Sequence, residues 1–247
     1  MNAIEIKNLT KRFGGRAVVE DLSFSVKQGE FISLLGVNGA GKTTTIKMLS
    51  CLTAPSEGDA LIMGHSIANE STEVKKIIAV SPQETAVAPN LTVRENLEFM
   101  ARIYGKKKAQ AVKCADSMIE SFMLREFEKS KTSTLSGGWQ RRLSIALALI
   151  CEPQVLFLDE PTLGLDIIAR RELWQHIGKL KGKITIILTT HYLEEAEALS
   201  DRIAVMANGR LKALGTVREL CEITQKSRFE DAFVGLCAEV TNTEKAD

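Results

Sequence analysis

A glycine-rich stretch near the N-terminus has the residue types and spacing of a phosphate-binding site. Residues 36–44, GVNGAGKTT, fit the pattern Gly-x-x-x-x-Gly-Lys-[Ser/Thr]. Glycines let the backbone curl so that successive N–H groups face one anion, and a following helix adds partial positive charge there. Lys42 can then reach the β- and γ-phosphates of a nucleotide, and the Thr43 hydroxyl can hold Mg²⁺. The pattern therefore predicts a nucleoside triphosphate site.

Two acidic residues follow a second apolar run. Residues 154–158, QVLFL, predict a buried strand, and Asp159 and Glu160 come directly after it. In α/β sheets, ligands bind at the edge formed by the carboxyl ends of the strands. Asp159 can hold Mg²⁺ there, and Glu160 can orient or deprotonate a water. An isolated Asp-Glu pair is usually a solvated turn, but its place after an apolar strand, in a chain with a phosphate loop, favours catalysis.

Three further candidates have both a structural and a functional interpretation. His191 follows the apolar run 184–190; a lone histidine is usually structural, but at this sheet edge it can instead hydrogen-bond a γ-phosphate. Residues 136–138, Ser-Gly-Gly, precede a helical pattern and suit either a second anion site or a flexible helix cap. Phe13 is either a core or turn aromatic or a stacking face for a base. The residues alone leave these alternatives open.

The candidate binding and catalytic residues need a sheet and helices to position them. Residues 31–35 predict a buried strand leading into the glycine loop, and residues 44–50 predict the helix after it. Phe13 is expected in the loop after the first strand. Further strands are expected at residues 4–9, 22–26, 60–64 and 77–80, an acidic helix at 193–199, and a hairpin over 202–214 with a type I′ turn at Asn208-Gly209.

The stretch from residue 92 to 149 has helical spacing and little strand character. Thr92 and Glu95 have the spacing of a capping box, and Gly105 suits the helix end. We expect a helical subdomain inserted in the nucleotide-binding core, over about residues 84–150. The tail from residue 215 predicts one or two short helices, and the polar residues 241–247 are expected to fray.

Composition excludes several classes of protein. The 247 residues are 45% hydrophobic and 26% charged, with a formal net charge of +1, so overall charge gives no argument for nucleic-acid binding. No run approaches the ~20 apolar residues of a membrane span, and the first residues do not have the pattern of a signal peptide. The five cysteines lack a metal-ligand spacing. Any membrane role is therefore expected to come through a partner.

Taken in their order along the chain, the motifs resemble those of the nucleotide-binding subunit of ABC transporters over about residues 4–214. Residues 36–44 match Walker A, and residues 155–160 match Walker B with its catalytic glutamate. The other matches are the Q-loop glutamine (Gln83), the family signature (135–139), the D-loop (163–166) and the switch histidine (His191). The resemblance implies an α/β fold: a P-loop NTPase core with an antiparallel β subdomain and an inserted α-helical subdomain. It places the ATP-binding domain at residues 1–222 and a short helical tail at 223–247.

The resemblance also implies the site residues. The catalytic set is Glu160 as general base, with His191 and Gln83. The ATP contacts are Phe13 on the adenine, with Gly36, Asn38, Gly39, Ala40, Gly41, Lys42, Thr43 and Thr44 around the phosphates. The Mg²⁺ ligands are Thr43, Gln83 and Asp159. The signature residues, which reach the nucleotide of a second cassette, are Leu135, Ser136, Gly137, Gly138 and Trp139, with Asp166 in the D-loop.

Two departures from the family pattern stand out. The signature usually ends in glutamine, and Trp139 holds that place; residues 136–138, which face the phosphate, are kept, so function is expected to survive. The D-loop lacks the common Ser-Ala before Leu165-Asp166. This variation, with residues 229–233, resembles the branch that exports drugs, polysaccharides and similar compounds.

The resemblance implies a function and partners. Two cassettes, in a homodimer, would hold ATP and Mg²⁺ between them, and the Q-loop and helical subdomain would receive membrane permease subunits. The chain would then be cytoplasmic, peripheral on the inner face of the cell membrane, and no nucleic acid is expected. The alternative is an ABC ATPase in DNA repair, on ribosomes or in regulation. Against it, about fifty residues separate Gln83 from Leu135, too few for a long coiled coil, and the chain has one cassette with Glu160 and His191 both present.

Overall fold

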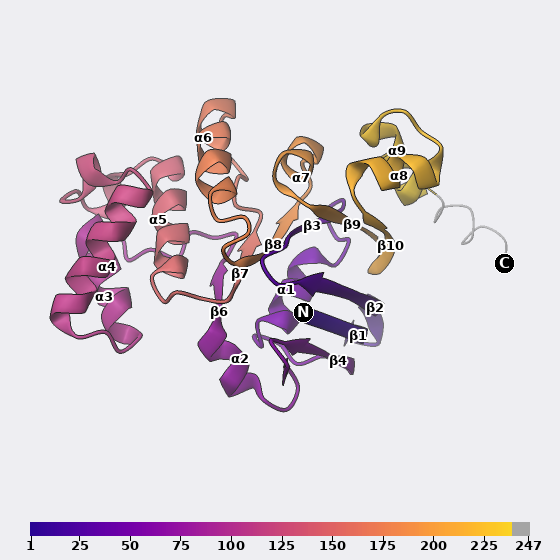
Figure 1. Cartoon of the computed structure of the whole chain (residues 1–247), viewed down its shortest axis with the longest axis horizontal. Coiled ribbons are helices and arrows are strands. Elements are labelled where there is room, and N and C mark those ends of the chain that lie inside the picture. The colour runs from indigo at the N-terminus through magenta and orange to yellow at the C-terminus, as the bar shows by residue number, and fades with distance from the viewer. Residues whose placement is uncertain (239–247) are drawn as a thin grey trace.

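The computed structural model describes residues 1–238, which form two sheets with helices between and around them (Figure 1). The strands are β1 (Asn2–Phe13), β2 (Arg16–Lys27), β3 (Phe31–Leu35), β4 (Glu57–Ile62), β5 (His65–Ser66), β6 (Ile78–Ser81), β7 (Val155–Asp159), β8 (Thr185–Thr190), β9 (Arg202–Ala207) and β10 (Arg210–Gly215). The helices are α1 (Lys42–Leu49), α2 (Ser71–Ile77), α3 (Val93–Ile103), α4 (Lys108–Ser121), α5 (Gly137–Leu149), α6 (Ile167–Gly178), α7 (Leu193–Leu199), α8 (Val217–Thr224) and α9 (Phe229–Ala238). Two 3-10 turns, η1 (Arg125–Phe127) and η2 (Thr132–Thr134), lie between α4 and α5.

The larger sheet brings the predicted chemical residues to one edge. Its strand order is β10-β9-β3-β8-β7-β6, and its strands run parallel except for β10, which is antiparallel to β9. The register sets Leu35 of β3 beside Thr190 of β8, and Asp159 of β7 beside Thr189 of β8. The three strands therefore end together, and the chain segments that follow them share one edge.

Both faces of this sheet are covered, which explains the continuous apolar runs. Along β7, Val155 and Phe157 enter the core that contains α1 and the smaller sheet, whereas Leu156 and Leu158 enter the core with α5 and α6. All four side chains are fully buried. Side chains alternate between the faces of a strand, so a strand buried on both sides has no polar face. Each such burial contributes roughly 1.5–3 kcal/mol relative to exposure.

The smaller sheet is antiparallel, in the order β2-β1-β4-β5. The prediction of a short first strand with Phe13 in the following loop is wrong, because β1 continues to Phe13, which pairs with Arg16. Register shifts interrupt the β1–β2 ladder between Ile6 and Leu9 and again beyond Leu9. Bulges of this kind break the alternation of apolar residues, so the pattern underestimates the strand.

The first helix of the predicted helical subdomain, α3, has the residues that the sequence predicted at its start and just after its end. Thr92 and Glu95 form a reciprocal capping box at the start of α3. Gly105, with φ of 83°, follows the last turn of α3 in the left-handed conformation. Helix α5, by contrast, is buried on nearly all sides instead of along one stripe, because it packs against α3 and against β6, β7 and α6.

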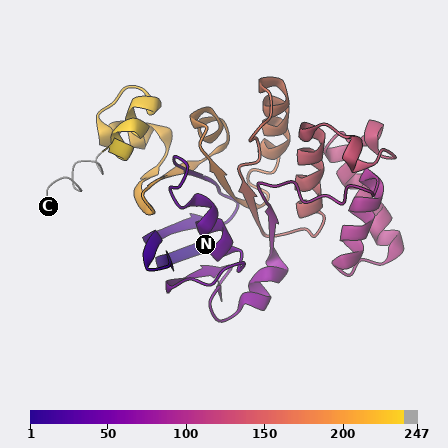
Figure 2. The ribbon, with the colours of Figure 1, turned by 180° about the vertical axis from the view of Figure 1, so that it is seen from behind.

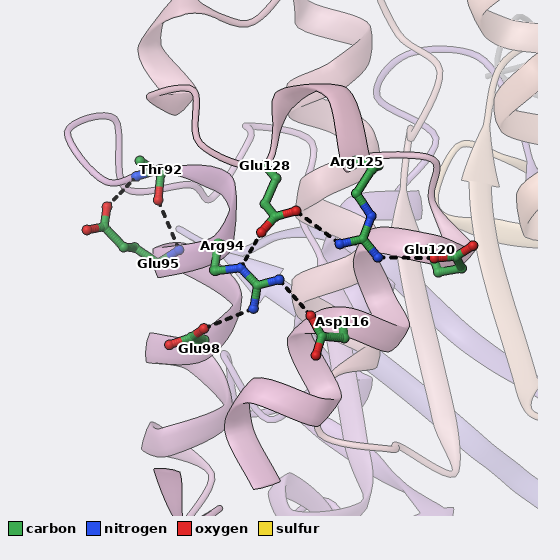
Figure 3. Close-up of polar contacts among 8 residues, drawn as sticks. All are labelled: Thr92, Arg94, Glu95, Glu98, Asp116, Glu120, Arg125 and Glu128. Atoms are coloured by element: carbon green, nitrogen blue, oxygen red, sulfur yellow. Dashed lines mark hydrogen bonds and ion pairs between the residues drawn. The ribbon is translucent and has the colours of Figure 1, made fainter. Parts of the chain in front are cut away.

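A charge network joins the helices of this region (Figure 3). Arg94 of α3 pairs with Glu98 at 3.2 Å, with Asp116 of α4 at 2.6 Å and with Glu128 after η1 at 2.6 Å. Arg125 pairs with Glu128 at 3.0 Å. The pKa of Arg94 is raised, chiefly by its hydrogen bond to Asp116. The pKa of Glu128 is lowered, chiefly by the hydrogen bond that it accepts from Arg94. The network connects α3, α4 and η1, so this region is held as one unit.

The C-terminal elements lie at the other end of the long axis from α3 and α4 in both views (Figures 1 and 2). The predicted hairpin is confirmed, with φ of 50° at Asn208 and 75° at Gly209, as a type I′ turn requires. Helices α8 and α9 pack on β9 and β10. The predicted domain boundary after residue 222 falls inside α8, and the domain limits stay a prediction. Residues 241–247, predicted to fray, lie outside the described residues.

Across residues 1–238, no helix combines the length and the apolar character that crossing a bilayer requires.

Candidate functional site

A cavity of about 380 Å³ opens at the carboxyl edge of the parallel sheet. It is bounded by the glycine loop after β3 and by residues that follow β6, β7 and β8. Its lining residues are Val18, Asn38, Gly39, Ala40, Gly41, Lys42, Thr43, Thr44, Gln83, Glu160, Leu163 and His191. The fold thus brings together residues from four separate parts of the chain that were predicted to share one site.

The glycine loop is shaped by close backbone contacts. A Cβ on Gly36 would lie 2.4 Å from the Met206 carbonyl oxygen, and one on Gly41 would lie 2.8 Å from the Val18 carbonyl oxygen. Gly41 also has φ of 97° and is the N-cap of α1, which therefore begins at Lys42, earlier than the predicted residue 44. No side chain of residues 1–238 caps this helix. The N–H groups of its first turn are consequently available to an anion.

Lys42 is a buried cation inside this loop. Its Nζ donates to the carbonyl oxygens of Gly36 at 2.7 Å and Val37 at 3.2 Å, and lies 3.5 Å from Glu160 Oε1. Burial lowers the pKa of Lys42, while the neighbouring Glu160 and Asp159 carboxylates oppose the shift. The ammonium group is thus held at the cavity wall by contacts that a phosphate can replace.

Oxygen donors suited to a hard cation meet beside Lys42. The Thr43 hydroxyl donates to Asp159 Oδ1 at 3.1 Å, and the Thr189 hydroxyl donates to the same oxygen at 2.5 Å. Hydroxyl and carboxylate oxygens are the ligands that Mg²⁺ prefers. Thr43 and Asp159 therefore fit the predicted metal, and Gln83 lines the same cavity.

Glu160 lies between two basic residues. Its Oε1 faces Lys42, and its Oε2 lies 3.0 Å from His191 Nδ1. The backbone of Glu160 is left-handed, with φ of 47°, a conformation that costs about 1–3 kcal/mol for a residue other than glycine. Its N–H donates to the carbonyl oxygen of Thr189 at 3.1 Å and to the hydroxyl at 3.0 Å. A strained, nearly buried carboxylate held beside a histidine can accept a proton from a water.

The sequence patterns did not single out Arg141, which organises the segment of Gln83. The buried guanidinium of Arg141 donates to the Pro82 carbonyl oxygen at 2.6 Å and to the Gln83 carbonyl oxygen. Burial lowers the pKa of Arg141, and the charge of Asp159 opposes that shift. The available signal was an arginine near the start of a helix whose later residues, 143–149, are almost all apolar.

The signature residues lie outside the cavity lining. Ser136 is the N-cap of α5, yet its side chain makes no capping bond, and Leu135 beside it is buried. A Cβ on Gly137 would meet nothing within 4 Å, and one on Gly138 would make only ordinary contacts with α6 and the loop before it. The chain therefore presents this second glycine-bearing helix end on its surface.

Trp139 is partly buried and packs against side chains of its own chain. Its ring lies 4.6 Å from that of Phe127, and the Arg142 guanidinium lies 4.3 Å from its centre. Arg142 also pairs with Glu172 of α6. The tryptophan that replaces the usual glutamine therefore connects α5 with η1 and, through Arg142, with α6.

Of the other predicted residues, Gly36 and Asp159 lie just outside the cavity lining, in contact with Lys42 and Thr43, whereas Asp166 and Phe13 lie away from it. Asp166 is the N-cap of α6 and accepts from the N–H groups of Ile168 and Ala169, each at 2.9 Å. Phe13 is 53% exposed, with the Lys11 Nζ 5.0 Å from its ring centre. An exposed ring at a strand end excludes the core interpretation of Phe13 and leaves the turn and base-stacking interpretations.

Comparison with known proteins identifies the family. Residues 19–163 match the family described as ABC transporter. The chain is 42% identical over 234 residues to the doxorubicin resistance ATP-binding protein DrrA of Mycobacterium tuberculosis, covering 94% of this chain and 69% of that protein. It is 43% identical over 221 residues to the Nod factor export ATP-binding protein I of Burkholderia lata, covering 89% and 72%.

A solved structure shares the fold. It is an ATP-binding cassette dimer in a post-hydrolysis state with ADP and Pi; it is 27% identical, has a TM-score of 0.78, and the match covers 86% of this chain and 98% of that one. The predicted fold class, with its P-loop core and antiparallel sheet, is confirmed. The chain therefore belongs to the ABC transporter family, as an ATP-binding cassette that hydrolyses ATP.

Proposed function

We propose that this chain binds Mg²⁺-ATP in the cavity at the sheet edge, hydrolyses it with Glu160 as general base, and energises export through a separate membrane permease. The observation that carries the catalytic part is the row Lys42–Glu160–His191. It sets a phosphate-binding cation, Lys42, and a histidine against the same proton acceptor, Glu160, at 3.5 Å and 3.0 Å, and all three side chains line one cavity.

The glycine loop would hold the triphosphate. Lys42 would leave its carbonyl contacts to bind the β- and γ-phosphates, and the first-turn N–H groups of α1 would donate to phosphate oxygens. Phe13 would stack on the adenine. Thr43, Asp159 and Gln83 would hold Mg²⁺, which supplies charge that neutralises the phosphate oxygens.

Glu160 and His191 would act on the water and the γ-phosphate. Glu160 takes a proton from the water while the oxygen of that water forms a bond to the γ-phosphorus. The bond between the γ-phosphorus and the β–γ bridging oxygen breaks, which releases ADP and phosphate. His191 orients the Glu160 carboxylate and hydrogen-bonds the γ-phosphate. Gln83, held by Arg141, lines the cavity beside them.

A second copy of the cassette would complete the site, packed head to tail. Residues 136–138 of one chain would face the γ-phosphate bound by Walker A of the other. The open space above Gly137 and the uncapped start of α5 support this arrangement, because no side chain of residues 1–238 fills that space or caps that helix. The dimeric solved structure supports the pairing of cassettes.

The permease would contact the outer face of α3 and the Q-loop. A groove of about 570 Å³ lies along α3, where exposed Phe99 and Ile103 lie with Leu91 among charged side chains. An apolar groove with a charged rim suits a short amphipathic helix. The names of the two relatives, which specify drug resistance and Nod factor export, favour export. The cassette would then lie on the cytoplasmic face of the cell membrane.

Partner capture tests the transport part. The tagged chain is expressed in its native cell, the membranes are solubilised in mild detergent, and co-purifying proteins are quantified. We expect one polytopic membrane protein in comparable amount with wild type and with Lys42→Ala. Phe99→Asp should reduce its recovery by about tenfold or more, because an exposed anchor of the groove is lost. Recovery with ribosomes, DNA or nothing would keep the ATPase chemistry and refute the transport proposal.

A further inference from the structure

Helix α6 contacts the segment that carries His191 through two side chains one turn apart. Arg170 and Trp174 are separated by four residues and so share a face of α6. Arg170 contacts Tyr192, and Trp174 contacts Glu195 in the first turn of α7. The two helices stand side by side above the parallel sheet (Figure 1).

The first contact is a stack that ends at the catalytic pair. The Arg170 guanidinium lies 4.1 Å from the centre of the Tyr192 ring. That ring lies 4.1 Å from the His191 ring, tilted by 40°. His191 Nδ1 then lies 3.0 Å from Glu160 Oε2. An unbroken series of contacts therefore runs from the first turns of α6 to the proposed general base.

The second contact involves a carboxyl group with no exposure to solvent. Glu195 is 0% exposed, and its Oε1 accepts from Trp174 Nε1 at 3.0 Å. Burial raises the pKa of Glu195, while the hydroxyls of Thr190 and Thr162, the Trp174 indole and the Arg170 charge oppose the shift. Burying a carboxyl group is costly, so a role in packing alone would be met more cheaply by an apolar side chain.

The polar groups at this junction are incompletely bonded. Within residues 1–238, Thr162 Oγ1, Arg170 Nε and Glu195 Oε2 are the buried side-chain polar atoms without a hydrogen bond of good geometry, although the Thr162 and Thr190 hydroxyls lie close enough to Glu195 to oppose its pKa shift. All three belong to the junction between the loop after β7, α6 and α7. Buried groups left unsatisfied tend to mark functional sites, because packing alone does not favour them. Such a junction can exchange partners when α6 moves.

We propose that Arg170, Tyr192 and Glu195 are positioning residues for ATP hydrolysis. Tyr192, held by Arg170, keeps the His191 ring against Glu160. Glu195 holds α7 to the same helix through Trp174. The inference rests on the proposed roles of Glu160 and His191.

The arrangement makes the orientation of α6 part of the catalytic site. The N-cap of α6 is Asp166, in the D-loop. Any contact that turns the start of α6 therefore shifts Arg170 and, through Tyr192, the His191 ring. A displacement near 1 Å in a catalytic group lowers turnover by up to about 100-fold. We expect ATP affinity to change little, because neither Arg170 nor Tyr192 lines the nucleotide cavity.

The first test compares Tyr192→Ala with Tyr192→Phe in steady-state Mg²⁺-ATP hydrolysis by the purified full chain. Tyr192→Ala removes the ring between Arg170 and His191, so kcat should fall about 10- to 100-fold while KM for ATP stays within about twofold. Tyr192→Phe keeps the ring and should retain kcat within about twofold. A residue that only stabilises the fold would not produce this difference between kcat and KM.

The second test uses the buried carboxyl group. Glu195→Leu removes the acceptor for Trp174 and should lower kcat about tenfold. Glu195→Gln keeps an acceptor oxygen and should stay within about threefold. Glu197→Gln, on the exposed side of α7, is the matched control and should match wild type. Arg170→Met combined with Tyr192→Ala should be no slower than the slower single variant, because both act through one stack.

Specific outcomes would overturn the inference. Wild-type kcat in folded Tyr192→Ala and Arg170→Met would do so, as would equal losses in Tyr192→Ala and Tyr192→Phe. Should Tyr192→Ala fail to fold, the kcat of Arg170→Met and the comparison of Glu195→Leu with Glu195→Gln test the inference instead. Glu160→Gln is measured in the same assay: full turnover there would refute the proposed general base. A slow Glu160→Gln with normal positioning variants would refute only the inference.

Discussion

Two helices, α1 and α5, begin at or directly after a glycine, and the two helix starts differ in how closely the rest of the chain packs around their glycines. At the start of α1, glycine is required by the chain itself, because a side chain at Gly36 or Gly41 would collide with backbone carbonyls. At the start of α5, Gly137 has open space around it, and Ser136 makes no capping bond. The first end lines a cavity with Lys42 buried in it, whereas the second lies on the surface.

The difference teaches that one chain carries two separate halves of a nucleotide site. The half around Lys42 is assembled in a cavity, and the half around Gly137 lies on the surface. The residues around Lys42 are connected to Asp159 and Glu160 by contacts within the chain itself. The residues around Gly137 have backbone donors at the start of α5, and within the described part of the chain no side chain caps them. Variants at the two ends should therefore fail in different ways.

The largest expected effect lies inside the cavity. Glu160→Gln removes the proton acceptor and keeps the shape, so turnover should fall by roughly 10²–10⁴-fold. ATP affinity should stay within about threefold, because Lys42 and the glycine loop are unchanged. Stopped-flow nucleotide binding and phosphate release measure the two quantities. Turnover near wild type would place the general base elsewhere.

Lys42→Ala should lose binding itself. Truncating a buried, hydrogen-bonded charge costs about 2–5 kcal/mol of binding, which corresponds to a roughly 30-fold or greater increase in Kd for ATP. Isothermal titration with ATP measures this, and circular dichroism checks that the fold is kept. An unchanged Kd would mean that the triphosphate does not occupy the loop.

Gly137→Asp should affect the surface half alone. The new side chain has room in the free chain, so folding and ATP binding by the single cassette should be unchanged. Turnover should fall about 10- to 100-fold, because a charged side chain blocks donors that would face the γ-phosphate of the second copy. A parallel loss of ATP affinity would contradict the separation of the two halves.

Trp139→Gln should have the smallest effect. It removes the contact with Phe127 and the stacked Arg142, worth about 1–2 kcal/mol together. The melting temperature should fall by about 2–8 °C. Turnover should change by less than about threefold, because residues 136–138 are retained. Calorimetry and ATPase assays distinguish this outcome from a direct role of Trp139 at the nucleotide.

Local patterns predicted the cavity half well. The glycine loop, the acids after β7 and His191 after β8 each follow an apolar run, and parallel strands necessarily bring such positions to one edge. The capping box at Thr92 and the hairpin turn at Asn208 were also predictable, because their signals lie within a few residues.

Features that depend on distant contacts were not predictable in this way. Arg141 reaches the Gln83 carbonyl across 58 positions of the chain, and Tyr192, the N-cap residue before α7, stacks on Arg170 of α6. The length of β1 was underestimated because bulges break its alternation. Trp139 was noted as a departure, but its contact with Phe127 required the packed helical region.

Mixing two inactive variants tests the central claim most directly. Lys42→Ala disables the cavity half and Gly137→Asp the surface half. In a mixed head-to-tail dimer, both defects fall in one composite site and leave the other intact. An equal mixture should regain up to roughly a quarter of wild-type turnover, because about half of the dimers are mixed and each has one intact site of two. A mixture as inactive as its components would contradict a site shared between two chains.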